Sequence, residues 1–124
     1  FYADFFHFKK YGISITGAQY ARLPFGPVVD NYEIYLGLMV HKRRVLIEEK
    51  RFGDFLGEVI ISNQSPSLEI FQPEEIETLA KVKGYFENYS ATKISERAHQ
   101  EKGYQETEDY QPISYQYAAD IELD

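Results

Sequence analysis

Two prolines flanking a short turn place the strongest constraint on how this chain folds. The stretch Ile15–Leu23 ends at Pro24-Phe25-Gly26-Pro27. Proline lacks an N–H donor and disfavours helix in the residue before it, so a strand over 18–23 must stop here. Proline is tolerated in the first turn of a helix. The sequence therefore predicts a strand, a turn on Gly26 and a helix that begins at Pro27. Two of the four turn residues are prolines and have no backbone N–H to offer a phosphate. We therefore expect this turn to be architectural and not a phosphate-binding loop.

Apolar periodicity and capping residues predict about four helices. Gly12 and Gly103 are suitable helix stops, Ser90 is a natural N-cap, and Pro73 suits a helix start. The predicted helices cover residues 1–12, 28–41, 73–89 and 91–101. Two of them carry an apolar stripe expected to face the core, formed by Val28, Tyr32, Tyr35, Leu36 and Met39, and by Ile76, Leu79, Val82, Phe86 and Tyr89.

Two β-rich runs flank a Gly-Asp pair in the middle of the chain. They are residues 45–52 and 55–63, on either side of Gly53-Asp54, and this arrangement is typical of an antiparallel hairpin. The fold class expected is therefore α+β, with about four helices around a small antiparallel sheet. A length of 124 residues suits one domain spanning 1–124.

Composition narrows the protein class. Hydrophobic residues make up 44% of the chain, enough for a packed core, and there is no cysteine and no apolar run of membrane-spanning length. We expect a cytoplasmic protein. The opening FYADFFHFKKYG begins abruptly within a predicted helix. It suggests that the chain lacks its native N-terminal residues.

The C-terminal segment 104–124 holds six acidic residues and no Lys or Arg, within a net charge of −7. Such a charge disfavours nucleic acid and would suit a basic protein partner. A solvated tail is the simpler alternative, but the segment is rich in tyrosine, and residues 113–117 could dock on the domain. The candidate partner-binding residues are Tyr104, Glu108, Asp109, Tyr110 and Tyr117.

No pattern in the sequence indicates a metal or a cofactor. His7, His41 and His99 lie on three different predicted helices, and a metal site would require several of them to converge. The run Lys42-Arg43-Arg44 is best explained as the positive end of a helix, and no nucleotide-binding loop is present. No cofactor is expected.

Ser95, Glu96 and His99 resemble a nucleophile, an acid and a base, and they lie within one predicted helix. Catalytic triads seldom come from one helix, and a serine inside a helix usually lacks an oxyanion hole. A structural role is therefore the better interpretation, although a small enzyme remains an alternative. The acidic pairs Glu48-Glu49 and Glu74-Glu75 carry no catalytic signal, because strand neighbours diverge and helix-start acids serve the dipole.

The order of several motifs resembles the Panacea domain, the SocA-like antitoxin domain of bacterial and phage toxin–antitoxin systems. The aromatic opening helix, the turn of Gly26, Pro27 and Val28, and the Ser95-Glu96-x-x-His99 helix carry this resemblance. So does the closing Ile113-Ser114-Tyr115 element. The resemblance implies that these motif residues hold the fold and that no catalytic residue exists.

The resemblance also implies a function: neutralisation of a co-encoded toxin by direct binding. In similar proteins the toxin can be a small alarmone synthetase, and the gene can belong to a prophage. An adaptor that delivers its toxin to a protease, or a partner domain of a DNA-binding regulator, are the alternatives from other classes.

Overall fold

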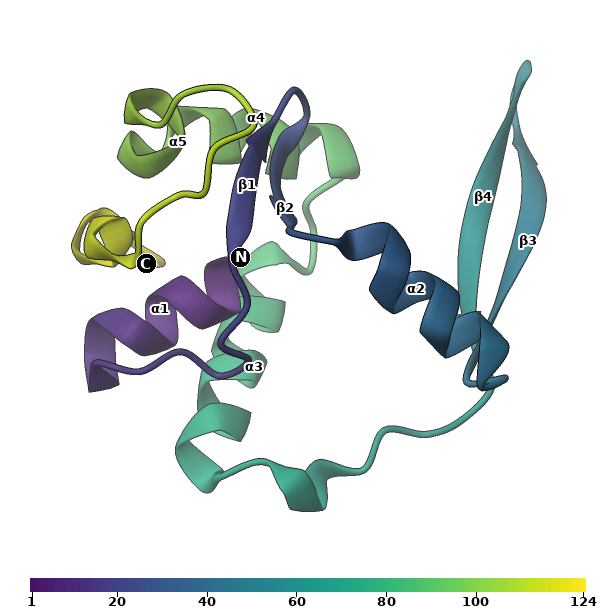
Figure 1. The fold of residues 1–124 in the computed structure, drawn as a ribbon, viewed down its shortest axis with the longest axis horizontal. Coiled ribbons are helices and arrows are strands. Elements are labelled where there is room, and N and C mark those ends of the chain that lie inside the picture. The colour runs from purple at the N-terminus through teal and green to yellow at the C-terminus, as the bar shows by residue number, and fades with distance from the viewer. The chain divides into compact units, whose positions relative to one another are not determined.

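The computed structural model describes residues 1–124 and contains five α-helices, two short 3-10 helices and two antiparallel hairpins (Figure 1). The α+β class is thereby confirmed. The chain divides into two compact units: unit 1 comprises residues 1–30 and 69–124, and unit 2 comprises residues 31–68. None of the helices has both the length and the apolar character needed to cross a membrane.

The aromatic opening helix α1 (Tyr2–Tyr11) is the centre of unit 1. It ends, as predicted, at Gly12, which adopts the left-handed conformation with φ 74° and donates its N–H to the Phe8 carbonyl. α1 packs against α3 (Pro73–Phe86) and against the 3-10 helix η2 (Tyr115–Asp120). Phe5 is fully buried and stacks on Tyr115, so the two ends of the chain share one core.

A hydrogen bond between two buried side chains fixes α1 on α3. The His7 Nδ1 lies 2.8 Å from the Thr78 hydroxyl oxygen, and the Thr78 hydroxyl donates to the Glu74 carbonyl at 3.0 Å. A hydroxyl has one proton, so His7 Nδ1–H must be the donor to Thr78. The predicted core-facing stripe of α3 was wrong at its start, because Thr78 is buried and Ile76 is 37% exposed.

The carboxylate of Asp4 joins α1 to the segment that leads into the first strand. It accepts hydrogen bonds from the backbone N–H groups of Ile15 and Thr16, at 2.9 and 2.8 Å, and from the hydroxyls of Thr16 and Tyr20, at 2.6 and 2.5 Å. Burial alone would raise the pKa of this carboxyl. The hydrogen bonds from Thr16 and Tyr20 outweigh burial, so the pKa lies below its ordinary value.

The first hairpin corrects the prediction for the Gly-Pro-Val turn. Strand β1 (Tyr20–Leu23) pairs with β2 (Gly26–Val29), so Pro27 lies in a strand opposite Arg22 and does not begin a helix. In a two-residue hairpin the pair flanking the turn is hydrogen-bonded and the next pair is not. The missing N–H of Pro27 therefore points away from β1 and costs no ladder bond.

The C-terminal segment adds a third extended piece beside β1. Backbone bonds join Arg22 to Tyr110 and Gln111, and Ile113 to Tyr20, so residues 110–113 run antiparallel to β1. Farther on, Ile121 and Leu123 are 2% and 4% exposed. The predicted docking of residues 113–117 is confirmed, and this part of the chain is not a solvated tail.

The helix α4 (Ala91–Gln100) begins at Ser90, whose hydroxyl accepts the Lys93 N–H, as predicted. The predicted stop at Gly103 was wrong, because α4 ends at Gln100 and Gly103 lies buried inside α5 (Lys102–Glu106). A Cβ on Gly103 would approach Tyr117 to 2.9 Å. This glycine is therefore required for close packing and not for ending a helix.

A second buried carboxylate joins α1, α4 and the C-terminal segment. Glu101 accepts a hydrogen bond from the Tyr2 hydroxyl at 2.9 Å, and its other close neighbour is Arg97 Nε at 3.4 Å. Arg97 also donates to the Glu122 carbonyl at 2.8 Å. Here burial dominates, and the pKa of Glu101 is raised despite Tyr2 and Arg97.

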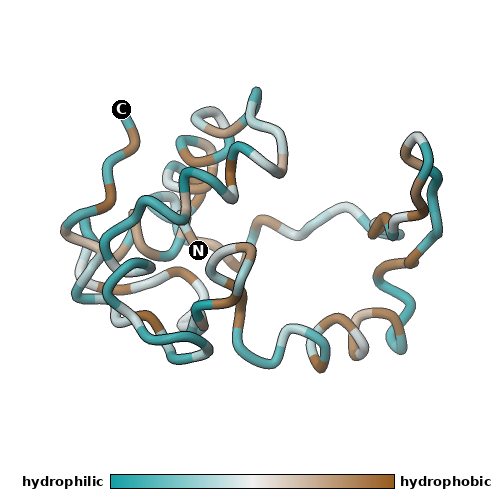
Figure 2. The backbone as a smooth tube through the Cα atoms, turned by 90° about the horizontal axis from the view of Figure 1, so that it is seen from above, coloured by the Kyte–Doolittle hydropathy of each residue, from teal (hydrophilic) through white to brown (hydrophobic).

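Unit 2 is built from α2 (Tyr32–His41), β3 (Val45–Phe52) and β4 (Phe55–Ser62). The predicted hairpin is confirmed, with Gly53-Asp54 as its turn. The predicted helix 28–41 begins only at Tyr32, because residues 26–29 form β2. Its apolar stripe was expected to face the core, yet no residue of α2 is buried, and the helix is largely apolar (Figure 2).

We predict that Asp4→Asn lowers the free energy of unfolding by about 2–3 kcal/mol, because a carboxamide cannot accept all four bonds. The depressed pKa of Asp4 stabilises the fold above the ordinary carboxyl pKa of about 4, and this contribution is lost as pH falls through the folded-state value. The difference between wild type and variant should therefore shrink on acidification, as measured by urea unfolding at several pH values.

Glu101→Gln is the matched control, because it changes the other buried carboxylate, whose pKa is raised. The amide oxygen still accepts the Tyr2 hydroxyl, so the expected loss is within about 1 kcal/mol. Equal destabilisation by both substitutions would contradict the special role of Asp4.

Candidate functional site

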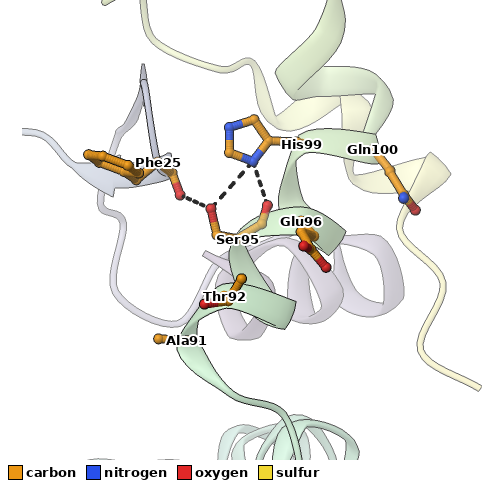
Figure 3. Close-up of a pocket in the computed structure, with 7 residues that line it drawn as sticks. All are labelled: Phe25, Ala91, Thr92, Ser95, Glu96, His99 and Gln100. Carbon is orange, nitrogen blue, oxygen red and sulfur yellow. Dashed lines mark hydrogen bonds between the residues drawn. The ribbon is translucent and has the colours of Figure 1, made fainter. Parts of the chain in front are cut away.

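Side chains of α4 and α5 hold the tip of the β1–β2 hairpin, and Figure 3 shows the contact that Ser95 of α4 makes with Phe25. The Ser95 hydroxyl donates to the Phe25 carbonyl at 2.7 Å. His99 Nε2 lies 2.8 Å from the Pro24 carbonyl, and the Tyr104 hydroxyl donates to the Leu23 carbonyl at 2.5 Å. Three consecutive backbone carbonyls of the turn thus lie within hydrogen-bond distance of three side chains that follow more than sixty residues later in the chain.

The geometry between Ser95 and His99 is unsuited to nucleophile activation. His99 Nδ1 lies 2.5 Å from the Ser95 carbonyl oxygen and 3.4 Å from its hydroxyl oxygen. A neutral imidazole has one N–H, which goes either to the Ser95 carbonyl from Nδ1 or to the Pro24 carbonyl from Nε2. The serine proton is itself directed to Phe25. In this arrangement both side chains position the turn.

Glu96 does not complete a catalytic arrangement. It is exposed, and it forms no hydrogen bond or ion pair in the structure, whereas the orienting acid of a triad contacts the base. Ser95, Glu96 and His99 do line one open pocket of about 800 Å³. Its other lining residues are Phe25, Ala91, Thr92 and Gln100.

Phe25 is the most exposed large apolar side chain of the protein, at 87%. It lies at the hairpin tip and lines this pocket and a second one formed with α1, β2 and α4. Aromatic side chains are enriched at protein–protein interfaces relative to the rest of the surface. Sequence reasoning treated Phe25 only as part of a turn, and no periodic signal marked its exposure.

The predicted partner-binding residues of the C-terminal segment are placed differently from one another. Tyr104 is buried at 4% exposure and stacks under the Arg22 guanidinium, and the Tyr117 hydroxyl donates to Glu106 at 3.0 Å. Glu108, Asp109 and Tyr110 are exposed. Asp109 lies 3.5 Å from Arg22, and Tyr110 is 67% exposed.

Arg22 organises this acidic segment, although no pattern in the sequence marks it as a functional residue. Its guanidinium donates to the Thr107 carbonyl at 2.5 Å, lies near Asp109, and covers the ring of Tyr104. Its Nε makes no well-aligned hydrogen bond, since Asp109 stands 3.5 Å away. The arginine therefore fixes the backbone before Glu108 and leaves the acidic side chains at the surface.

No group of three or more His, Asp or Glu side chains is arranged to hold a metal ion. His7, His41 and His99 lie in α1, α2 and α4. Lys42, Arg43 and Arg44 follow the end of α2 and are exposed.

The chain belongs to the antitoxin SocA-like, Panacea domain family, whose model matches residues 1–105. The match includes Gly26, Pro27, Val28, Ser95, Glu96 and His99, and the closing Ser114 and Tyr115 lie beyond it. Comparison with curated proteins and with solved structures found no match. Ser114 caps η2 by accepting the Gln116 N–H, and the Tyr115 hydroxyl donates to the Ala18 carbonyl. These two closing residues therefore have structural contacts of their own.

We predict that His99→Ala and Ser95→Ala each lower the free energy of unfolding by about 1 kcal/mol, because each substitution removes a side chain that holds a carbonyl of the turn. Gln100→Ala changes an exposed residue of the same pocket with no such bond and should shift it by less than about 0.5 kcal/mol. Thermal unfolding followed by circular dichroism provides the comparison. A fully stable His99→Ala protein would argue against a structural role for this histidine.

Proposed function

We propose that this protein is an antitoxin that neutralises a co-encoded toxin protein by direct binding. The observation that carries the proposal is membership of the SocA-like Panacea family over residues 1–105. The Ser95 hydroxyl donates to the hairpin turn and the His99 ring lies against it, and these contacts support a binding role over a catalytic one. A small alarmone synthetase is the toxin class that we propose to test first.

The proposed partner surface lies on unit 1 around the hairpin tip. Residues 110–113 run beside β1, with Ile113 next to Tyr20 and Tyr110 next to Arg22, so Tyr110 lies toward the tip that carries Phe25. Exposed aromatic side chains there would supply contact area. Glu108 and Asp109 would steer a basic toxin surface. Tyr104 is left out of this surface because it is buried.

The first test is growth rescue in a bacterial host. Each gene that flanks the gene of this protein is induced alone and then together with this protein. A flanking gene that is toxic when induced alone, but not when this protein is co-expressed, supports the proposal. Co-purification of the pair then tests direct contact, and the toxin level in the rescued cells distinguishes inhibition from delivery to a protease. Toxicity that persists in the presence of folded protein for every neighbour would contradict an antitoxin role.

We predict that Glu108→Lys weakens toxin binding about tenfold at low salt and progressively less at high salt, because exposed charges act through long-range attraction. Glu87→Lys, an exposed charge reversal just after α3, is the matched control and should have little effect. Binding is measured by titration calorimetry between 50 and 500 mM salt, roughly a threefold change in Debye length. A binding affinity that does not change with salt concentration would contradict the electrostatic part of the proposal.

Tyr110→Asn tests the aromatic contribution. Tyr110 has φ 64°, a conformation that asparagine accepts more readily than most residues, so the substitution removes the ring without straining the backbone. We expect weaker binding with unchanged thermal stability. Loss of stability instead would assign Tyr110 a structural role.

A further inference from the structure

The β3–β4 hairpin of unit 2 is a two-stranded sheet with both outer edges unpaired. Its side chains are exposed on both faces, and Val45 is the one buried residue of the two strands. An isolated two-stranded hairpin is marginally stable, and an unpaired edge is a template for another strand. The hairpin therefore has the properties of a surface that another strand completes.

The register of the hairpin shows which backbone groups face the free edge of β3. Phe52 and Phe55 flank the two-residue turn and form a hydrogen-bonded pair, and the Asn63 N–H donates to the Arg44 carbonyl. Even-numbered residues of β3 therefore bond to β4. The N–H and C=O groups of Ile47, Glu49 and Arg51 point to the free edge.

The charges along β3 are self-complementary. The strand reads Glu48-Glu49-Lys50-Arg51, two negative charges followed by two positive ones. When this pattern runs antiparallel to a copy of itself, acids of one strand meet bases of the other. None of the four side chains forms an ion pair within its own chain, since the four salt bridges of the structure involve other residues. These charges are therefore free to pair with a second copy.

We propose that β3 pairs with β3 of a second copy of this chain, forming a four-stranded antiparallel sheet across a two-fold axis. The axis stands perpendicular to the sheet, so directly opposed residues must share a face, and odd residues pair with odd ones. A register centred on Lys50 places Glu49 opposite Arg51 of the second copy, twice. The two central lysines face each other across the axis, which is unfavourable, and each also lies diagonal to Glu48 of the opposite strand, which offsets part of this repulsion.

This register also removes a defect of the isolated hairpin. Glu49 lies directly opposite Glu58 in β4, and like charges facing each other across strands are destabilising. An arginine from the second copy would stand next to Glu49 and offset that repulsion. The β4 edge offers no such complementarity, because Glu58 is its only charged residue. For this reason β3, and not β4, is the pairing edge, and this pairing is independent of the proposed antitoxin function.

The test is a charge rearrangement that keeps composition and net charge constant. E49K/K50E changes the order from two acids and two bases to an alternating one, so that like charges oppose each other in the register centred on Lys50. If the two strands slide so that the register is centred on position 49, the variant again places like charges opposite each other. Within its own hairpin a lysine at position 49 would face Glu58, which favours the hairpin. Loss of pairing therefore cannot be attributed to an unfolded hairpin.

Sedimentation velocity of the full chain over a concentration series measures self-association. We expect a wild-type dimer, and a dimer Kd raised about tenfold or more by E49K/K50E. The fourfold variant E48K/E49K/K50E/R51E restores complementarity in reversed order and should restore the dimer. A wild-type chain that stays monomeric overturns the proposal. An E49K/K50E dimer as tight as wild type also overturns it and indicates the β4 edge or another surface.

Discussion

The carboxylate of Asp4 is the interaction on which the arrangement of unit 1 depends. It is 2% exposed and accepts four hydrogen bonds from Ile15, Thr16 and Tyr20. A buried carboxylate is tolerated only where such donors replace water. These bonds fix the start of β1 on α1, and β1 in turn carries β2 on one edge and residues 110–113 on the other. The position of the hairpin tip follows from this one charged group.

Local signals in the sequence predicted the elements whose ends are decided by neighbouring residues. Gly12, Ser90 and the Gly53-Asp54 turn each act through backbone geometry close by, and the structure has all three as predicted. Pro27 and Gly103 were misread, because their roles are set by tertiary contacts. The proline is tolerated by an outward-facing strand position, and the glycine is required by the approach of Tyr117.

The sequence predicted that Ser95 and His99 lie close together, but it did not predict which groups they contact. The spacing of Ser95 and His99 placed them together on one helix face, which the structure bears out at 3.4 Å. Their partners are the carbonyls of Pro24 and Phe25, and a backbone acceptor leaves no trace in side-chain patterns. Asp4 shows the same difficulty. Nothing in its sequence neighbourhood distinguishes a surface acid at a helix start from the acceptor of four bonds.

The two units differ in how completely their surfaces are satisfied. Unit 1 matches its two buried carboxylates, Asp4 and Glu101, with donors and exposes few large apolar side chains, of which Phe25 is the most prominent. Unit 2 leaves most of its apolar side chains and two strand edges exposed. If toxin binding uses unit 1 and self-pairing uses unit 2, a dimer carries two copies of one partner surface. If the toxin is itself a dimer, binding at the second surface becomes intramolecular. The overall affinity of the complex then rises although each interface keeps the same contacts.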